Sequence, residues 1–172
     1  MKFSFATEAD LAAVHALVES AYRGESSRAG WTTEADLVDG PRTSVDELRA
    51  IITAPDNAFL LARDGAGSLL ACCHLQRRGD ALYFGMFAVD PTRQADGVGT
   101  AMLAEAERIA RDLWRLPRVT MQVIEARTEL IDWYARRGYH QTGNALPFPY
   151  DVQARTGPRI AGLRLVMLEK AL

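Results

Sequence analysis

The feature that most constrains the fold is a strand, a helix and a second strand that follow one another in the middle of the chain. The apolar runs Ala81–Val89 and Arg118–Ile124 are typical of strands. Between them, apolar residues recur every three or four positions, which predicts a helix that begins near Gly99 and ends before Pro117. Because such crossovers are right-handed and join parallel strands, we expect the two runs to be parallel neighbours, or near neighbours, at the centre of a mixed sheet.

The rest of the chain alternates between the same two hydrophobic periods. Capping residues followed by apolar stripes predict a first helix after Thr7 and a short second helix after Ser44. A last helix should run from Thr128 through Arg137, where Gly138 stops it. The remaining strand-like runs are Phe59–Arg63, Leu69–Gln76, Tyr139–Thr142 and Leu163–Lys170. The first two should form an antiparallel meander with the central strand, so that the whole chain is an α/β sandwich.

Composition limits the kinds of partner. A chain of 172 residues fits one domain, and a net charge of −2 gives no broad field to attract nucleic acid or an anionic membrane. Cys72 and Cys73 are adjacent in an apolar run, which indicates core packing and a reducing compartment rather than a disulfide framework. No signal-like or membrane-spanning apolar segment is present. We therefore expect a cytoplasmic protein with a small or local partner.

The loop between the central strand and its helix is the best candidate for a binding site. Gly97 and Gly99 let the backbone bend so that several N–H groups point to one place, and the following helix adds the positive end of its dipole there. This geometry fits a phosphate-bearing ligand, although a lone G-x-G is more often a simple turn. A Walker A loop would need a lysine, and a dinucleotide fingerprint would need a small residue at Met102. A dinucleotide-dependent oxidoreductase is therefore disfavoured.

Two motifs in this order resemble a known family. Gln94-Ala95-Asp96-Gly97-Val98-Gly99 matches the signature Q/R-x-x-G-x-G/A, and Trp133–Tyr139 contains Y-x-x-x-G-F/Y. The chain thus resembles the GNAT superfamily of N-acetyltransferases, with a matching element order along nearly its whole length. The resemblance implies a single-domain α/β fold, with a mixed sheet of about seven strands splayed between the fourth and fifth and flanked by four helices.

The resemblance also implies acetyl-CoA as co-substrate and assigns roles to particular residues. The pantetheine arm of acetyl-CoA should lie along the end of the fourth strand, and its pyrophosphate on the loop that follows. Tyr134 matches the general acid that protonates the departing thiolate. The expected cofactor-binding residues are Met86, Phe87, Ala88, Val89, Arg93, Gln94, Ala95, Asp96, Gly97, Val98, Gly99 and Thr100.

The sequence does not identify the general base. Some relatives carry a glutamate on the fourth strand, where this chain has Tyr83, so a water chain or another carboxylate must serve. Glu34, Asp36 and Glu125 are candidates, but most surface carboxylates are simply solvated. Arg127 is a second departure, because many relatives have an asparagine there that contacts the cofactor arm.

The acceptor should lie against the loops Arg23–Thr43 and Asn144–Arg159. The expected acceptor-binding residues are Tyr22, Trp31, Glu34 and Arg42 from the first loop and its edge, and the second loop offers Phe148, Tyr150, Arg155 and Arg159. An arginine would bind a carboxylate of the acceptor and Glu34 would bind an ammonium, with solvated loop charge as the alternative.

Three functions remain possible from the sequence. The first is transfer of an acetyl group to a primary amine of a small molecule or peptide by direct attack in a ternary complex. The second is a GNAT-fold module that binds acyl-CoA without catalysis, supported by the missing carboxylate on the fourth strand. The third is the disfavoured oxidoreductase. We expect no metal, since the three histidines lack ligand spacing, and exposed edge strands make a homodimer possible.

Overall fold

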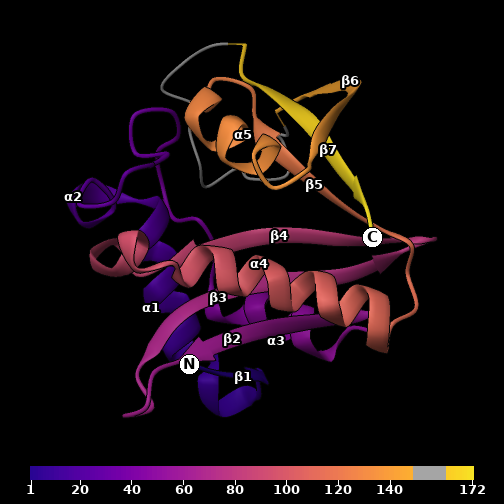
Figure 1. Cartoon of the computed structure of the whole chain (residues 1–172). Helices are drawn as coiled ribbons and strands as arrows, with labels where there is room; N and C mark the ends of the chain where they lie inside the picture. Colours follow the sequence, from indigo (N-terminus) through magenta and orange to yellow (C-terminus); the bar gives the residue numbers. More distant parts are fainter. Residues whose placement is uncertain (149–161) are drawn as a thin grey trace.

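A seven-stranded mixed sheet forms the centre of the computed structural model, which describes residues 1–148 and 162–172 (Figure 1). The strands lie in the order β1-β2-β3-β4-β5-β7-β6, and only the β4–β5 pair is parallel. Their bounds are Lys2–Phe5 (β1), Asn57–Arg63 (β2), Leu69–Arg78 (β3), Ala81–Val89 (β4), Arg118–Ile124 (β5), His140–Pro147 (β6) and Arg164–Ala171 (β7).

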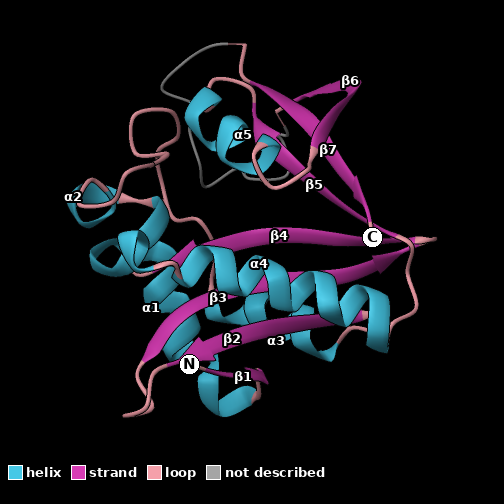
Figure 2. Cartoon of the chain, viewed as in Figure 1, coloured by secondary structure: helices cyan, strands magenta, loops and turns pink. Residues whose placement is uncertain are grey.

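Helices cover both faces of this sheet (Figure 2). Four of them have eight or more residues in the described part of the chain: α1 (Leu11–Tyr22), α3 (Val45–Thr53), α4 (Val98–Arg108) and α5 (Thr128–Ala135). Shorter pieces are α2 (Gly24–Ser27), the 3₁₀ turns Glu8–Asp10 and Pro91–Asp96, and a π-helical turn, Ile109–Leu113, that extends α4. The expected mixed sheet of about seven strands with four flanking helices is therefore confirmed.

Alternation along the central strands divides the core into two layers. On β2, Leu60 packs in the layer with α4, whereas Leu61 packs in the layer with α1 and α3. Cys73 and Cys72 follow the same alternation, and both thiols are free and fully buried. The interpretation of these cysteines as core packing is confirmed. Burial raises the pKa of the Cys72 thiol to about 12, so it stays protonated.

The two parallel strands part after a short common stretch. They pair only from Ala81 to Tyr83 on β4, opposite Arg118–Thr120 on β5. Beyond this point β4 follows β3 and β5 follows β7, so the two strands diverge towards the start of α4 (Figure 1). A one-residue bulge bends β4 here, and Met86 has a φ of 42°. The expected splay between the fourth and fifth strands is confirmed.

Some element boundaries differ from the expectations. The last helix ends at Ala135 rather than Arg137, and the strand expected over Tyr139–Thr142 extends over His140–Pro147. The sequence also gave no sign of β1, because this strand has only four residues, mostly exposed, and so shows no alternation. In the described ranges, no helix is long and apolar enough to cross a membrane.

Gly97 should contribute to stability through its backbone conformation alone. Its φ is 76°, in the left-handed region, and a Cβ added there would meet no atom within 4 Å. We expect Gly97→Ala to lower the free energy of unfolding by about 1–2 kcal/mol because of this φ. Denaturant unfolding without ligand measures the effect.

Gly65→Ala is the matched control, because its added Cβ also meets nothing within 4 Å and its φ lies outside the left-handed region. Its stability should stay unchanged or rise by up to about 1 kcal/mol. Equal losses in the two variants would contradict the conformational explanation.

Candidate active site

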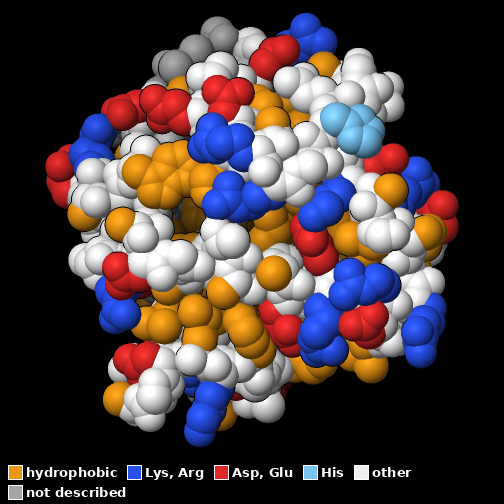
Figure 3. Space-filling model, viewed as in Figure 1, with side chains coloured by type: hydrophobic (Ala, Val, Ile, Leu, Met, Phe, Trp, Pro, Cys, Tyr) orange, Lys and Arg blue, Asp and Glu red, His pale blue; other side chains and the backbone are white. Residues whose placement is uncertain are grey.

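A cleft opens where β4 and β5 part. Most of the described residues that line it come from both strands, from the end of α1 and the loop after it, from the start of α4 and from α5. Gln94, Arg127, Phe148 and Leu165 complete the described lining. In the space-filling view a hollow lies between α5 and the start of α4, bordered by hydrophobic side chains and by Lys or Arg side chains (Figure 3). The strand divergence and the first turn of α4 therefore face the same space.

The loop before α4 presents backbone donors to this cleft. Asp90 accepts a hydrogen bond from the Thr92 N–H (2.9 Å) and begins the 3₁₀ turn that leads to Gly97. Gly97 then turns the chain into α4, and the N–H groups of Val98, Gly99 and Thr100 have no carbonyl one turn back within the helix. Gly97, Gly99 and Thr100 line the cleft. Three open amides and a helix dipole make this a site for an anion.

The side chains of this loop have partners of their own. Arg93 forms an ion pair with Asp96, so its charge is partly compensated within the loop. Gln94 accepts a hydrogen bond from the Trp31 N–H through its Oε1 (2.9 Å). Only Gln94 of these side chains lines the cleft, and it ties the loop after α1 to the loop before α4.

Arg137 lies beside the same helix start and was missed in the sequence. Its Nη2 donates to the Thr100 hydroxyl (2.8 Å), and its guanidinium stacks 3.6 Å above the Trp133 ring. No carboxylate of the described chain pairs with it, and its buried Nε has no partner. Burial, together with the charge of Arg136, lowers the pKa of Arg137. A cation without a counter-charge thus stands next to the open amides of α4.

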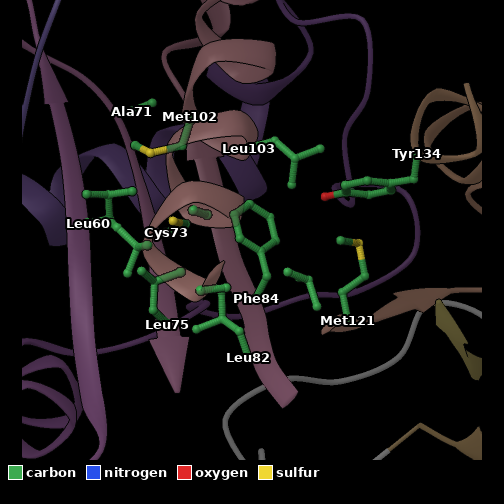
Figure 4. Close-up of a cluster of buried hydrophobic side chains, with 14 of the residues drawn as sticks. Leu60, Ala71, Cys73, Leu75, Leu82, Phe84, Met102, Leu103, Met121 and Tyr134 are labelled. Carbon is green, nitrogen blue, oxygen red and sulfur yellow. The ribbon is translucent and has the colours of Figure 1, made fainter. Parts of the chain in front are cut away.

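Tyr134 brings a phenol into the cleft from α5. Its side chain is only 4% exposed and contacts the rings of Trp133 and Tyr139 edge-on, at 5.0 and 5.7 Å between centroids. Figure 4 shows its oxygen pointing away from α5, towards Leu103 and Phe84. Burial raises the pKa of Tyr134 well above its usual value, so the hydroxyl keeps its proton at neutral pH.

Tyr22, at the end of α1, reaches the diverging part of β4. Its hydroxyl donates to the Phe87 carbonyl (3.0 Å), one of the backbone groups that no longer pairs with β5. Burial, and then the negative charge of Glu34, raise the pKa of Tyr22 to about 12. Tyr22 is therefore a neutral donor that holds the β4 backbone, and its ring forms a wall of the cleft.

Glu34 is held in a buried ion-pair cluster. Its two oxygens accept hydrogen bonds from Arg127 Nη1 (2.8 Å) and Arg23 Nη1 (3.1 Å), and the three side chains are only 10–12% exposed. Arg127 also donates to the Thr32 hydroxyl (3.0 Å). Burial alone would raise the pKa of Glu34, but Arg127, Arg42 and Arg23 outweigh it and hold the pKa below its usual value. Glu34 is thus a charged structural partner of two arginines.

Arg42 lies on the same side of the cleft without such a partner. Its guanidinium stands 5.2 Å from the centre of the Tyr22 ring, and its backbone N–H is fixed by Glu19 (2.7 Å). Among the residues that the structure describes, no carboxylate forms an ion pair with the Arg42 side chain.

The other sequence candidates fall into three groups. Glu125 and Asp36 do not line the cleft, and each forms an exposed ion pair, with Arg164 and Arg28 respectively. Tyr83, Trp31 and Phe148 do line it. The Tyr83 ring lies over Gly85, where a Cβ would approach it to 2.6 Å. The remaining candidates, Tyr150, Arg155 and Arg159, lie outside the described residues.

No group of possible metal ligands occurs within the described ranges.

We expect Glu34→Gln to destabilise the fold strongly, because it leaves two buried arginines facing each other without a carboxylate. The loss should be about 3–5 kcal/mol at neutral pH. Since the folded-state pKa of Glu34 lies below its ordinary value of 4.5, this stabilisation is complete above that value and disappears as the pH falls through the folded-state pKa. Denaturant unfolding at neutral and acidic pH measures both effects.

Glu25→Gln provides the control for this prediction, since Glu25 pairs with Arg28 in the same region but its side chain is 92% exposed. Its loss should stay below about 1 kcal/mol. A small effect of Glu34→Gln, equal to that of Glu25→Gln, would show that the cluster is not a stabilising one.

Comparison with known proteins identifies the family. The sequence profile described as Acetyltransferase (GNAT) family matches residues 15–139. The mycothiol acetyltransferase of Kineococcus radiotolerans is 28% identical over 157 residues, which cover 90% of this chain but only 45% of that protein.

Solved structures share the fold. A spermidine N-acetyltransferase mutant from Vibrio cholerae superposes with a TM-score of 0.71 at 15% identity, covering 99% of this chain and 95% of the other. A putative streptothricin acetyltransferase from Bacillus anthracis, in complex with acetyl coenzyme A, gives 0.59 at 14% identity over 72% of this chain and 67% of the other. With the profile match over most of its length, the chain belongs to the GNAT family of acetyltransferases, whose acetyl donor is acetyl-CoA.

Proposed function

We propose that this protein transfers the acetyl group of acetyl-CoA to a primary amine of a small molecule or peptide, by direct attack of the amine in a ternary complex. The observation that supports this most is the shared cleft: the open amides of α4, the diverging end of β4 and the Tyr134 side chain all border it. Donor phosphates, thioester and proton donor can therefore be held in one place.

Donor binding divides between two parts of the cleft. The pyrophosphate lies on the amides of Val98, Gly99 and Thr100, with Arg137 supplying the positive charge that the loop lacks. The pantetheine arm enters the splay and pairs with the backbone between Met86 and Val89. The Tyr22 hydroxyl satisfies the Phe87 carbonyl, and those N–H groups of this segment that do not pair with β3 polarise the thioester oxygen.

The chemical step forms a C–N bond and breaks a C–S bond. The neutral amine adds to the thioester carbonyl, and the tetrahedral intermediate collapses with CoA leaving as a thiolate. Tyr134 gives its proton to that sulfur and regains one from the solvent. Burial raises the pKa of the phenol, but the same apolar surroundings disfavour the thiolate anion, so the transfer is not strongly uphill.

The nitrogen becomes cationic when the C–N bond forms, and it then loses one proton to water, which balances the proton that Tyr134 gives to the sulfur. The only carboxylate of a described residue in the cleft lining is Glu34, and both of its oxygens are engaged by arginines. Its lowered pKa makes it a weak proton acceptor. The same observation is the one that favours the alternative function, an acyl-CoA-binding module without catalysis.

Tyr134→Phe distinguishes the two functions. We expect kcat to fall about 100-fold or more because the leaving thiolate loses its proton donor, while the Kd for acetyl-CoA stays within about two-fold. Steady-state release of free thiol and calorimetry measure the two quantities. Tyr139→Phe is the control, since this hydroxyl binds Glu107 (3.0 Å) and does not line the cleft. If neither variant changes turnover, Tyr134 is not the acid, and if the wild type shows no turnover with any amine, the binding module is the better description.

Arg137→Gln tests the proposed pyrophosphate contact. We expect the KM for acetyl-CoA to rise about ten-fold with kcat nearly unchanged, because a charge-assisted hydrogen bond to the cofactor is lost. The KM for acetyl-pantetheine, which lacks the diphosphate, should not change. The neighbouring Arg136 is exposed, so Arg136→Gln serves as the control. Equal losses for acetyl-CoA and acetyl-pantetheine would show that Arg137 acts only on the local fold.

A further inference from the structure

The acceptor side of the cleft carries an excess of positive charge. Its charged lining residues in the described part of the chain are Arg23, Arg42 and Arg127 against the single carboxylate of Glu34. Three guanidinium groups and one carboxylate give the lining an excess of two positive charges, and the Glu19 carboxylate beside it is engaged by the backbone N–H groups of Arg42 and Thr43. These groups gather at the end of α1 and the loop after it, where Arg127 reaches Glu34 from the start of α5.

Glu34 does not offer a site for an ammonium group. Arg127 and Arg23 each bind one of its oxygens, and Arg23 is further fixed by a hydrogen bond from its Nε to the Gly40 carbonyl (2.8 Å). An ammonium group at Glu34 would bring a third positive charge to a carboxylate that two buried arginines already more than neutralise. The cluster therefore repels a further positive charge rather than binding one.

Arg42 is the one arginine of this group whose guanidinium has no ion-pair partner in the described chain. It is half-buried, so part of its hydration is already lost, and it packs over the face of Tyr22. Tyr22 in turn binds the Phe87 carbonyl on β4, so its ring lies between Arg42 and the strand that should hold the thioester. A group bound to Arg42 is thus one aromatic ring away from the reacting carbonyl.

We infer that the acceptor is a small amine that carries an oxyanion, either a carboxylate or a phosphonate, and that Arg42 binds this group while the amine reaches the thioester past Tyr22. The inference rests on the proposed function and names its substrate class. The planar guanidinium suits an oxyanion with two oxygens, and binding it cancels part of the excess charge. A zwitterionic amino acid fits these requirements, whereas a polycationic amine does not.

A matched panel of acceptors tests the inference on the intact protein. The panel contains L-amino acids, their α-carboxamides, aminoalkylphosphonates and α,ω-diamines, with thiol release from acetyl-CoA as the readout. Rates are compared at equal concentrations of unprotonated amine. We expect at least one acid to exceed its uncharged amide about 10- to 100-fold in kcat/KM, and the diamines to be poor acceptors. The carboxylate and phosphonate arms show which oxyanion is preferred.

Arg42→Gln then ties this preference to one side chain. It should remove most of the advantage of the acid over the amide, acting mainly through KM, and leave the Kd for acetyl-CoA unchanged. Arg42→Lys should retain part of it. The control is Arg28→Gln, because Arg28 lies in the same region, pairs with Glu25 and Asp36, and is absent from the cleft lining.

The possible results separate the inference from the proposed function on which it rests. If amides or diamines reach the kcat/KM of the acids, the inference is wrong while the acetyltransferase function stands. The same holds if Arg42→Gln keeps the preference for acids over amides. Acetyl-CoA binding without turnover of any amine would instead overturn the proposed function, and the inference with it.

Discussion

The parting of β4 from β5 after Tyr83 is the constraint on which the rest of the site depends. A parallel pair that stops after three residues leaves backbone groups on both inner edges without a ladder partner. On β4, the structure satisfies one of them, the Phe87 carbonyl, with the Tyr22 hydroxyl, and it bends the strand by a bulge at Met86. The edge that remains open is suited to an extended ligand, because such a ligand can supply the missing hydrogen bonds.

The elements that form this splay were predictable because each has a strong local pattern. The apolar run of β4, the helical spacing after Gly99 and the apolar run of β5 fix a crossover, and the crossover fixes a parallel pair. The left-handed turn at Gly97 is also visible in the sequence, as a glycine just before a helix. By contrast, β1 is too short and too exposed to show alternation, and its place at the sheet edge is set only by pairing with β2.

The ion pairs and hydrogen bonds of the charged residues at the site could not be predicted from local sequence patterns. Arg127 and Glu34 are separated by 93 positions, so no local spacing connects them, and Glu34 looks in the sequence like any solvated carboxylate. Arg137 and Arg136 are adjacent in a charged stretch, and only the position of α5 against α4 decides which of them reaches Thr100. The sequence shows that Arg127 replaces the asparagine of many relatives, but it does not show what the arginine contacts. In the structure Arg127 binds Glu34, so that this candidate base is part of a buried ion pair.

Contacts of the loop after α1 join the α4 side of the cleft to the side that holds Glu34 and its arginines. The loop after α1 is attached to the α4 loop where Gln94 binds the Trp31 backbone, and to the start of α5 where Arg127 binds Thr32 and Glu34. The two attachments are only a few residues apart in the sequence, so the segment between them has little slack. A series of contacts thus leads from Gln94 through the backbone of this loop to Glu34 and Arg23. The loop before α4 and the arginines around Glu34 are therefore joined through this short loop, by its backbone and by one buried carboxylate.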